Sequence, residues 1–142
     1  MEYSPRCRIA VDYVKQAYRR LGHPYVTSAH LVLGLVTLNG GVGDTVLKRS
    51  GLSADLIECF LSSQCIAGEE TVDQHGAVFG RSAISALSRA ELEATRFGHA
   101  ILGVEHLALA LLAEDHGVAN DLFASAQVKR ENTRATILQD MK

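Results

Sequence analysis

The sequence lacks the features that mark nucleic-acid-binding, membrane and secreted proteins. Its 142 residues carry a net charge of −2, so there is no basic field to attract nucleic acid or an anionic membrane. The longest apolar stretch, residues 31–38, is interrupted by Gly34 and Thr37 and is too short to span a bilayer. Charge follows within two residues of Met1, without the apolar core of a signal peptide. We therefore expect a protein of the cytoplasm or of an organelle stroma, with no nucleic-acid or membrane partner.

Cysteine is also scarce. Cys7, Cys59 and Cys65 are odd in number and show no Cys-x-x-Cys spacing. This pattern predicts reduced thiols and argues against a disulfide framework or a zinc site. A chain of this length buries about two-thirds of the surface that its unfolded form exposes, which is enough for one core. We therefore expect a single domain over residues 1–142.

The sequence does contain an internal duplication. A displacement of 76 positions places residues 20–23 (Arg-Leu-Gly-His) on residues 96–99 (Arg-Phe-Gly-His). Apolar residues with the spacing of one helical face also recur at equivalent positions. Cys7, Val11, Val14, Tyr18 and Leu21 fall on Ala83, Leu87, Ala90, Ala94 and Phe97. Two copies predict a compact pseudo-symmetric pair rather than an open array of repeats.

Each copy is predicted to form four helices, so we expect an all-α fold of two pseudo-symmetric four-helix repeats, eight helices in total. Repeat one covers about residues 3–65 and repeat two about residues 79–142. The polar segment 66–78 has no helical period and is expected to be a linker. The sequence shows no β-branched alternation, so there is little case for strands. The expected helices cover about residues 5–21, 28–38, 42–49 and 53–61, and about residues 81–97, 104–115, 118–126 and 129–141.

The sequence offers little for catalysis or cofactor binding. The glycine-rich residues 39–43 lack the Gly-Lys-Ser/Thr of a phosphate-binding loop, and Ser82 is not part of a nucleophile elbow. Four histidines form two equivalent pairs, one in each copy. A residue that hydrogen-bonds a helix end is needed in every copy, whereas a catalytic residue is usually needed only once. We expect a structural role for them, with zinc binding as the less favoured alternative. They are His23, His30, His99 and His106. We expect no enzyme activity, no metal and no cofactor.

Several of these segments together resemble the double Clp repeat. Gly-His, His-Leu and Gly-Val pairs stand at equal distances from both opening helices, and copy two carries the fuller motif over residues 98–107. The resemblance covers nearly the whole chain. The matching segments are residues 3–6, 21–26, 30–35 and 41–42, with residues 79–81, 97–107 and 117–118.

This resemblance implies both a fold and a function. The double Clp repeat forms the N-terminal domain of Clp ATPases such as ClpA, ClpB and ClpC, as two pseudo-symmetric four-helix units. In that family the domain has no ATPase or peptidase activity. It receives substrates and adaptor proteins for the unfoldase ring, and in the ClpC branch it recognises phosphorylated arginine. The implied partners are client proteins, adaptor proteins and the Clp machinery.

Two departures from the family pattern affect the implied phosphoarginine pockets. Ala29 stands where the family usually has glutamate, whereas copy two keeps Glu105. Ser4 supplies a hydroxyl where the family favours threonine, but its counterpart in copy two is Gly80. We therefore expect each pocket to lack one of its two polar groups.

Tyr3 and Phe79 hold equivalent places just before the two opening helices. By the pseudo-symmetry we expect them to lie near each other. They either line a groove for clients or act as staples that fix the start of each helix. The candidate protein-binding residues are thus Tyr3, Ser4, Ala29, Phe79, Gly80 and Glu105.

The sequence therefore predicts a non-catalytic protein-binding module of a Clp-type unfoldase or protease system. Nothing in it resembles a Walker motif, so two forms are expected: the N-terminal part of an unfoldase, or a stand-alone adaptor or accessory subunit that docks on a Clp chaperone or protease. A small helical hydrolase is least favoured, because no nucleophile, base and orienting group can be assembled from the motifs.

Overall fold

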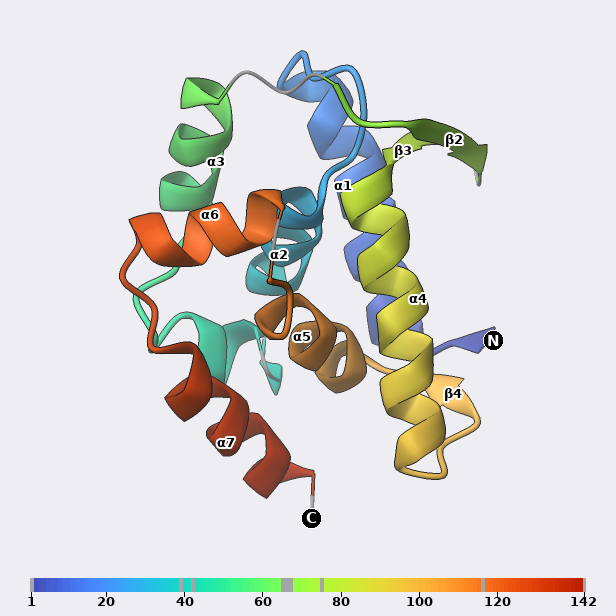
Figure 1. Ribbon diagram of the computed structural model, residues 1–142, viewed down its shortest axis with the longest axis vertical. Coiled ribbons are helices and arrows are strands. Elements are labelled where there is room, and N and C mark those ends of the chain that lie inside the picture. Colours follow the sequence, from blue (N-terminus) through green and yellow to red (C-terminus); the bar gives the residue numbers. More distant parts are fainter. Residues whose placement is uncertain are drawn as a thin grey trace.

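The computed structural model describes residues 2–38, 40–41, 43–64, 68–74, 76–115 and 117–141. In these ranges helices dominate, and two small pairs of strands join them (Figure 1), so the predicted all-α, eight-helix fold is confirmed. No helix within these ranges is long and apolar enough to cross a bilayer. Cys7 and Cys59 are free thiols, as predicted. Cys65 lies outside the described residues, as do Asn39 and Val42 of the glycine-rich turn.

Repeat one consists of a two-residue strand and four helical segments. The Ser4 side chain caps α1 by accepting a hydrogen bond from Cys7 N at 3.1 Å, and Ser53 caps α3 in the same way. The third segment, predicted as a helix over residues 42–49, is a five-residue π-helical turn in the described part of the chain. The elements are β1 (Glu2–Tyr3), α1 (Pro5–Arg20), α2 (Ser28–Thr37), η1 (Gly43–Leu47) and α3 (Ala54–Ser63).

Repeat two also contains four helices, and they match the predicted ranges to within three residues. The largest difference is at the end of α5, which stops at Leu112 because Ala113 already closes its last turn. Gln127, which replaces the glycine that follows η1 in repeat one, takes a left-handed backbone with φ 58°. The elements are α4 (Arg81–Arg96), β4 (Ile101–Leu102), α5 (Val104–Leu112), α6 (Val118–Ser125) and α7 (Arg130–Asp140).

The expectation that the chain contains no strands was wrong. Within the expected linker, β2 (Thr71–Gln74) and β3 (Ala77–Gly80) form an antiparallel hairpin in which Val72 pairs with Phe79. Gly76, with φ 78°, lies in the turn. Threonine, valine and phenylalanine favour strands, but each strand has only four residues and β2 is polar, so the alternation was too short to detect.

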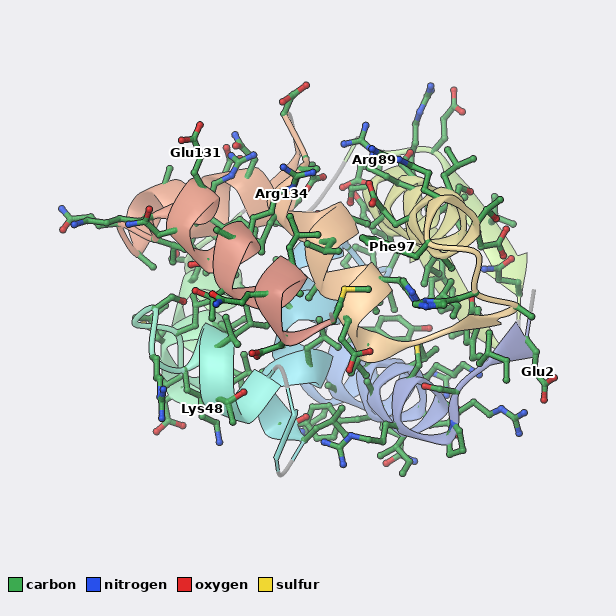
Figure 2. The ribbon with its side chains drawn as sticks, turned by 90° about the horizontal axis from the view of Figure 1, so that it is seen from below. Glu2, Lys48, Arg89, Phe97, Glu131 and Arg134 are labelled. Atoms are coloured by element: carbon green, nitrogen blue, oxygen red, sulfur yellow. The ribbon has the colours of Figure 1, made fainter. Side chains whose placement is uncertain are left out.

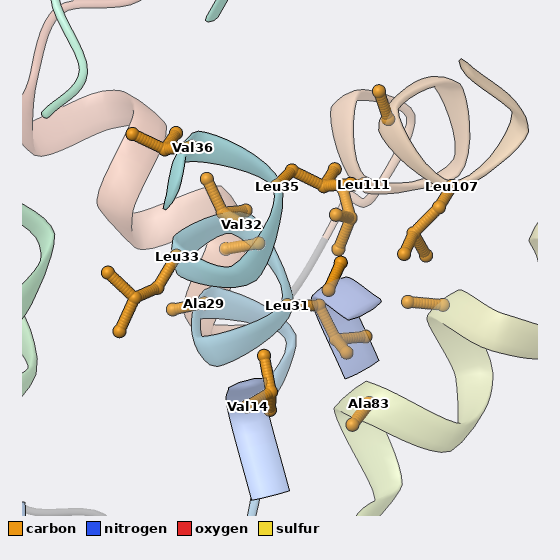
Figure 3. Close-up of a cluster of buried hydrophobic side chains, with 14 of the residues drawn as sticks. Val14, Ala29, Leu31, Val32, Leu33, Leu35, Val36, Ala83, Leu107 and Leu111 are labelled. Atoms are coloured by element: carbon orange, nitrogen blue, oxygen red, sulfur yellow. The ribbon is translucent and has the colours of Figure 1, made fainter. Parts of the chain in front are cut away.

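The helix α2 lies at the centre of the core. Its residues from Ser28 to Val36 are all buried. It packs against α1 and α3 of its own repeat and against α4, α5 and α6 of the other. Figure 3 shows Leu31 and Leu35 of this helix in one cluster with Leu107 and Leu111 of α5. The two repeats thus share one hydrophobic core.

The two repeats also exchange backbone pairs. Tyr3 of β1 pairs in parallel with Leu102 of β4, and Phe79 of β3 pairs in parallel with Val26. Each pair joins the start of one repeat's opening helix to the loop before the other repeat's buried helix. The two pairs are equivalent under the displacement of 76 positions. The matching hydrogen bonds, Ser4 N–H to Leu102 O and Gly80 N–H to Val26 O, are both 2.8 Å long.

The paired histidines hold the starts of the buried helices. Thr27 N–H donates to His30 Nδ1 at 2.8 Å, which leaves the His30 Nε2–H to donate to His23 Nδ1 at 2.8 Å. In repeat two, Gly103 N–H donates to His106 Nδ1 at 2.8 Å, and the His99 and His106 rings are joined at 2.9 Å. These bonds confirm the predicted structural role.

We propose that both repeats fold as one unit, because they share one core and each completes the strand pairing of the other. Leu33→Ala, at a fully buried position in repeat one, should lower the free energy of unfolding by about 2–5 kcal/mol. It should also lower the melting temperature of the whole chain in a single calorimetric transition. Two separate transitions, with only one moved by the substitution, would contradict one cooperative unit.

The histidine caps should make stability depend on pH. Burial lowers the pKa of His30 to about 3, and the neighbouring His23 adds to the effect. The unfolded chain therefore takes up this proton below about pH 6.5 while the folded chain does not, so stability is complete above that pH and falls with acidification. Relative to His30→Gln, the chain should lose about 2 kcal/mol between pH 6.5 and 5. Denaturant titrations of both proteins at pH 6.5 and at pH 5 measure this loss. If their free energies of unfolding differ by the same amount at both pH values, the prediction is contradicted.

Candidate protein-binding site

A groove runs between the two opening helices, α1 and α4. Its volume is about 620 Å³. Val11, Ile84 and Leu87 provide its apolar surface, and charges of both signs line it, including Arg8 and Glu91. Apolar surface of this kind with charges of both signs suits a polypeptide better than an ion or a small cofactor.

The structure separates the six predicted site residues into two clusters, one at the end of the molecule where α1 starts and the other at the end where α4 starts. Of the six, Tyr3 lines the groove. Tyr3 and Phe79 do not lie near each other, so that expectation was wrong. Tyr3 pairs with Leu102. Burial raises the pKa of Tyr3, and the nearby Cys7 and Glu91, in the second half of α4, add to the shift. Phe79 precedes the start of α4, at the end where Val26 lies. Figure 1 shows the N-terminus beside β4, far from β3.

The first cluster joins Tyr3 and Ser4 at the start of α1 to Glu105 in the first turn of α5. Among the described residues, the Glu105 carboxylate accepts no hydrogen bond and forms no ion pair. It lines a pocket of about 350 Å³ together with His99, His106 and Gly41. Burial raises the pKa of Cys7, one turn into α1, to about 11, and the charge of Glu105 contributes to that shift. This end therefore presents a hydroxyl and an unpaired carboxylate.

The Arg6 guanidinium lies at the edge of the same pocket. Its Nη2 donates to Gly40 O at 2.8 Å. A Cβ built on Gly41, which lines the pocket, would lie 3.2 Å from that nitrogen. The pocket that Glu105 lines is therefore bordered by a cationic group beside Gly41, and Asp140 adds a second carboxylate to its lining.

The second cluster joins Ala29, Phe79 and Gly80, and it offers no polar side chain of its own. Ala29 and Phe79 are fully buried, which for Phe79 fits the role of a staple better than direct contact with a client. The place beside Gly80 is taken by Glu69. A Cβ on Gly80 would lie 2.8 Å from Glu69 Oε1 and 2.8 Å from the Tyr25 ring.

Glu69 binds the first turn of α4. Its Oε1 accepts a hydrogen bond from Ser82 N at 2.7 Å, and its Oε2 accepts one from Ser82 Oγ at 3.2 Å. Its own N–H donates to Tyr25 Oη at 3.2 Å. A carboxylate is stabilised at this position because the first-turn N–H groups of a helix are unpaired donors. A residue of the expected linker thus fills this end.

The predicted composition of the two pockets was wrong. The sequence comparison grouped Ser4 with Ala29 and Gly80 with Glu105, because each pair belongs to one repeat. Each strand that precedes an opening helix pairs with the other repeat: Tyr3 pairs with Leu102, and Phe79 pairs with Val26. Ser4 therefore lies at the same end as Glu105, and Gly80 lies at the same end as Ala29. One end therefore has both polar groups and the other has neither.

A second carboxylate that the sequence analysis did not identify lies beside the filled end. Glu114 Oε1 accepts a hydrogen bond from Ser28 Oγ at 3.1 Å, and Ser28 Oγ accepts one from Ala119 N. The other carboxylate oxygen of Glu114, Oε2, is buried without a hydrogen-bond partner among the described residues. Burial raises the pKa of Glu114 to about 7. This network joins the starts of α2 and α6, and no sequence motif marks it.

A comparison with protein families identifies the fold. The family described as the Clp repeat (R) N-terminal domain matches residues 2–126 and, in a second match, residues 78–141. The chain belongs to this family. The overlapping matches agree with the duplicated architecture.

Curated relatives of the chain include Clp chaperones. The chain is 31% identical over 130 residues to the chloroplastic chaperone protein ClpC3 of Oryza sativa. The matched region covers 92% of this chain and 14% of that protein. The chain is 26% identical over 137 residues to the negative regulator of genetic competence ClpC/MecB of Bacillus subtilis, covering 96% of this chain and 17% of the relative. The chain thus spans about a sixth of the length of these relatives or less.

Solved structures show the same fold. The N-terminal domain of the chaperone ClpD from Arabidopsis thaliana has a TM-score of 0.79 at 20% identity, over 99% of this chain and 94% of that one. The Hsp104 N-terminal domain from Candida albicans has a TM-score of 0.72 at 12% identity, over 97% and 90%. Domains of this family are non-catalytic parts of Clp ATPases and generally bind substrates or adaptors.

Proposed function

We propose that this chain receives client and adaptor proteins for a Clp-type unfoldase, in the cytoplasm or in an organelle stroma. The observation that carries the proposal is the groove between α1 and α4, about 620 Å³ in volume. Its apolar surface can contact the apolar side chains that an unfolded client exposes. Because charges of both signs line the groove, it does not require a client of one net charge. Membership of the family supports a role in a Clp system, and a stand-alone adaptor or accessory subunit that docks on a Clp chaperone or protease is the alternative.

A charge placed in the groove should weaken client binding. Ile84→Glu puts a carboxylate on its apolar surface, whereas Leu56→Glu puts one on an exposed apolar position of α3 that does not line the groove. We expect Ile84→Glu to raise the Kd for fluorescein-labelled β-casein, an unfolded model client, by about tenfold or more, a cost of about 1.4 kcal/mol. Leu56→Glu should leave it unchanged in fluorescence anisotropy. Equal effects would argue against this groove.

We further propose that the end formed by Ser4 and Glu105 recognises phosphorylated arginine. The ligand carries a planar nitrogen group and a phosphate. A carboxylate can accept hydrogen bonds from the nitrogens, while a hydroxyl and a nearby guanidinium can bind the phosphate. Glu105, Ser4 and Arg6 provide these three groups. The end at Gly80 lacks them and already holds the Glu69 carboxylate, so binding should occur once per chain.

Calorimetric titration with free phosphoarginine should therefore give one site. Glu105→Ala removes the carboxylate and should weaken binding by about ten- to a hundredfold, as expected for one charge-assisted hydrogen bond of about 1.5–3 kcal/mol. Glu69→Ala, at the opposite end, serves as the matched control and should not change the affinity. Two equivalent sites, or a loss on Glu69→Ala instead, would overturn the assignment.

A further inference from the structure

A pocket of about 440 Å³ lies between α4 and the loop that follows α5. Ala86 and Ala110, both buried, provide apolar surface in it, and Ser85, an exposed residue of α4, also lines it. Carboxylates outnumber cationic side chains in its lining, with Glu69, Glu114 and Asp115 against Arg81 and Arg89. The pocket thus combines a small apolar surface with an excess of negative charge.

One carboxylate oxygen of this lining lacks a hydrogen-bond donor. Glu114 Oε2 is buried with no partner among the described residues. The two cationic side chains of the lining have other partners: Arg89 Nη1 donates to Ala113 O at 2.9 Å, and Arg81 pairs with Glu70 at 3.8 Å. Buried polar atoms are normally hydrogen-bonded, so the pocket is short of a donor.

In repeat one, a guanidinium occupies the equivalent place. Gly117, which lines the pocket, corresponds to Gly41 under the displacement of 76 positions. Ser82, in the first turn of α4, corresponds to Arg6 in α1. The Arg6 side chain reaches the loop after α2, where its Nη2 donates to Gly40 O at 2.8 Å. A Cβ built on Gly41 would lie 3.2 Å from that nitrogen.

In repeat two, the same place holds a carboxylate. The atom nearest to a Cβ built on Gly117 is Glu114 Oε1, at a position where repeat one has Leu38. Ser82 and Ser85 replace the larger side chains of α1, so α4 leaves space beside this carboxylate. Repeat two therefore has the space and the negative charge for a guanidinium, but it carries a serine at the position that supplies one in repeat one.

We propose that this pocket binds an unmodified arginine side chain of a client protein, in the place that Arg6 takes in repeat one. The guanidinium donates to the Glu114 carboxylate, and the aliphatic part of the side chain packs on Ala86 and Ala110. Arginine fits better than lysine because its planar group donates to a carboxylate through two N–H groups at once. The excess of carboxylates disfavours a phosphorylated arginine. The inference rests on the proposed function for the source of the arginine.

Calorimetric titration with a short peptide tests the pocket directly. The acetylated and amidated peptide Gly-Ala-Arg-Ala-Gly carries one arginine, and the same peptide with citrulline keeps its shape but has no charge. The titration is made at pH 8, because the pKa of Glu114 is raised to about 7. The arginine peptide should bind once per chain, and the citrulline peptide at least tenfold more weakly, as for a lost charge-assisted hydrogen bond. Equal binding of the two peptides would overturn the proposal.

Variants of the chain locate the binding. Glu114→Gln removes the charge but keeps an oxygen for Ser28, and it should raise the Kd for the arginine peptide about ten- to a hundredfold. Glu131→Gln, the matched control, removes a carboxylate from α7 and should leave the Kd unchanged. Figure 2 shows Glu131 well away from Arg89, which lines the pocket. Ser85→Phe fills the pocket from an exposed position and should weaken binding similarly even if Glu114→Gln does not fold. An unchanged Kd in Ser85→Phe would overturn the proposal.

The outcomes separate this pocket from the proposed function. If the chain binds β-casein but not the arginine peptide, the pocket is overturned and the proposed function stands. If the arginine peptide binds through Glu114 but β-casein does not bind, the pocket accepts arginine and the assignment to a client fails with the proposed function. If the peptide phosphorylated on its arginine binds through Glu114 at least as tightly as the unmodified one, the assignment to unmodified arginine is overturned.

Discussion

The structure depends on backbone pairing that crosses between the two repeats. Ser4 donates to Leu102 O and Gly80 donates to Val26 O, each over 2.8 Å. These bonds fix the start of each opening helix against the loop before the buried helix of the other repeat. The positions of α1 and α4, the groove between them and the composition of both ends all follow from this crossing. The shared core around α2 then stabilises the arrangement.

Much of the fold could be predicted from the sequence because helices are encoded locally. The apolar spacing from Cys7 to Leu21, the caps at Ser4 and Ser53 and the mostly apolar sequence of α2 each predict a helix without knowledge of what packs against it. The histidine caps were predictable for a similar reason, since a repeated residue beside a helix start points to a local hydrogen bond. The hairpin of β2 and β3 was missed because four residues are too few for a period.

The composition of the candidate site could not be predicted in the same way. Whether Ser4 lies beside Ala29 or beside Glu105 depends on which repeat supplies each side of an end, and this is decided by tertiary packing. The replacement of a hydroxyl by Gly80 looked like a simple loss in the sequence. In the structure, the absence of a Cβ lets Glu69 approach the first turn of α4. The role of Glu69 depends on the hydrogen bond that it accepts from Ser82, 13 positions further along the chain.

The reciprocal pairing has a consequence for how such a chain can evolve. Two identical single repeats would form the same crossed bonds as a two-fold symmetric dimer, in which every substitution occurs at both ends at once. Joining the repeats in one chain removes that constraint, because each position can then change alone. In this chain one end carries Ala29 and Gly80, while the other carries the polar groups of Ser4 and Glu105. Covalent duplication thus allows one surface to specialise while its twin becomes part of the scaffold.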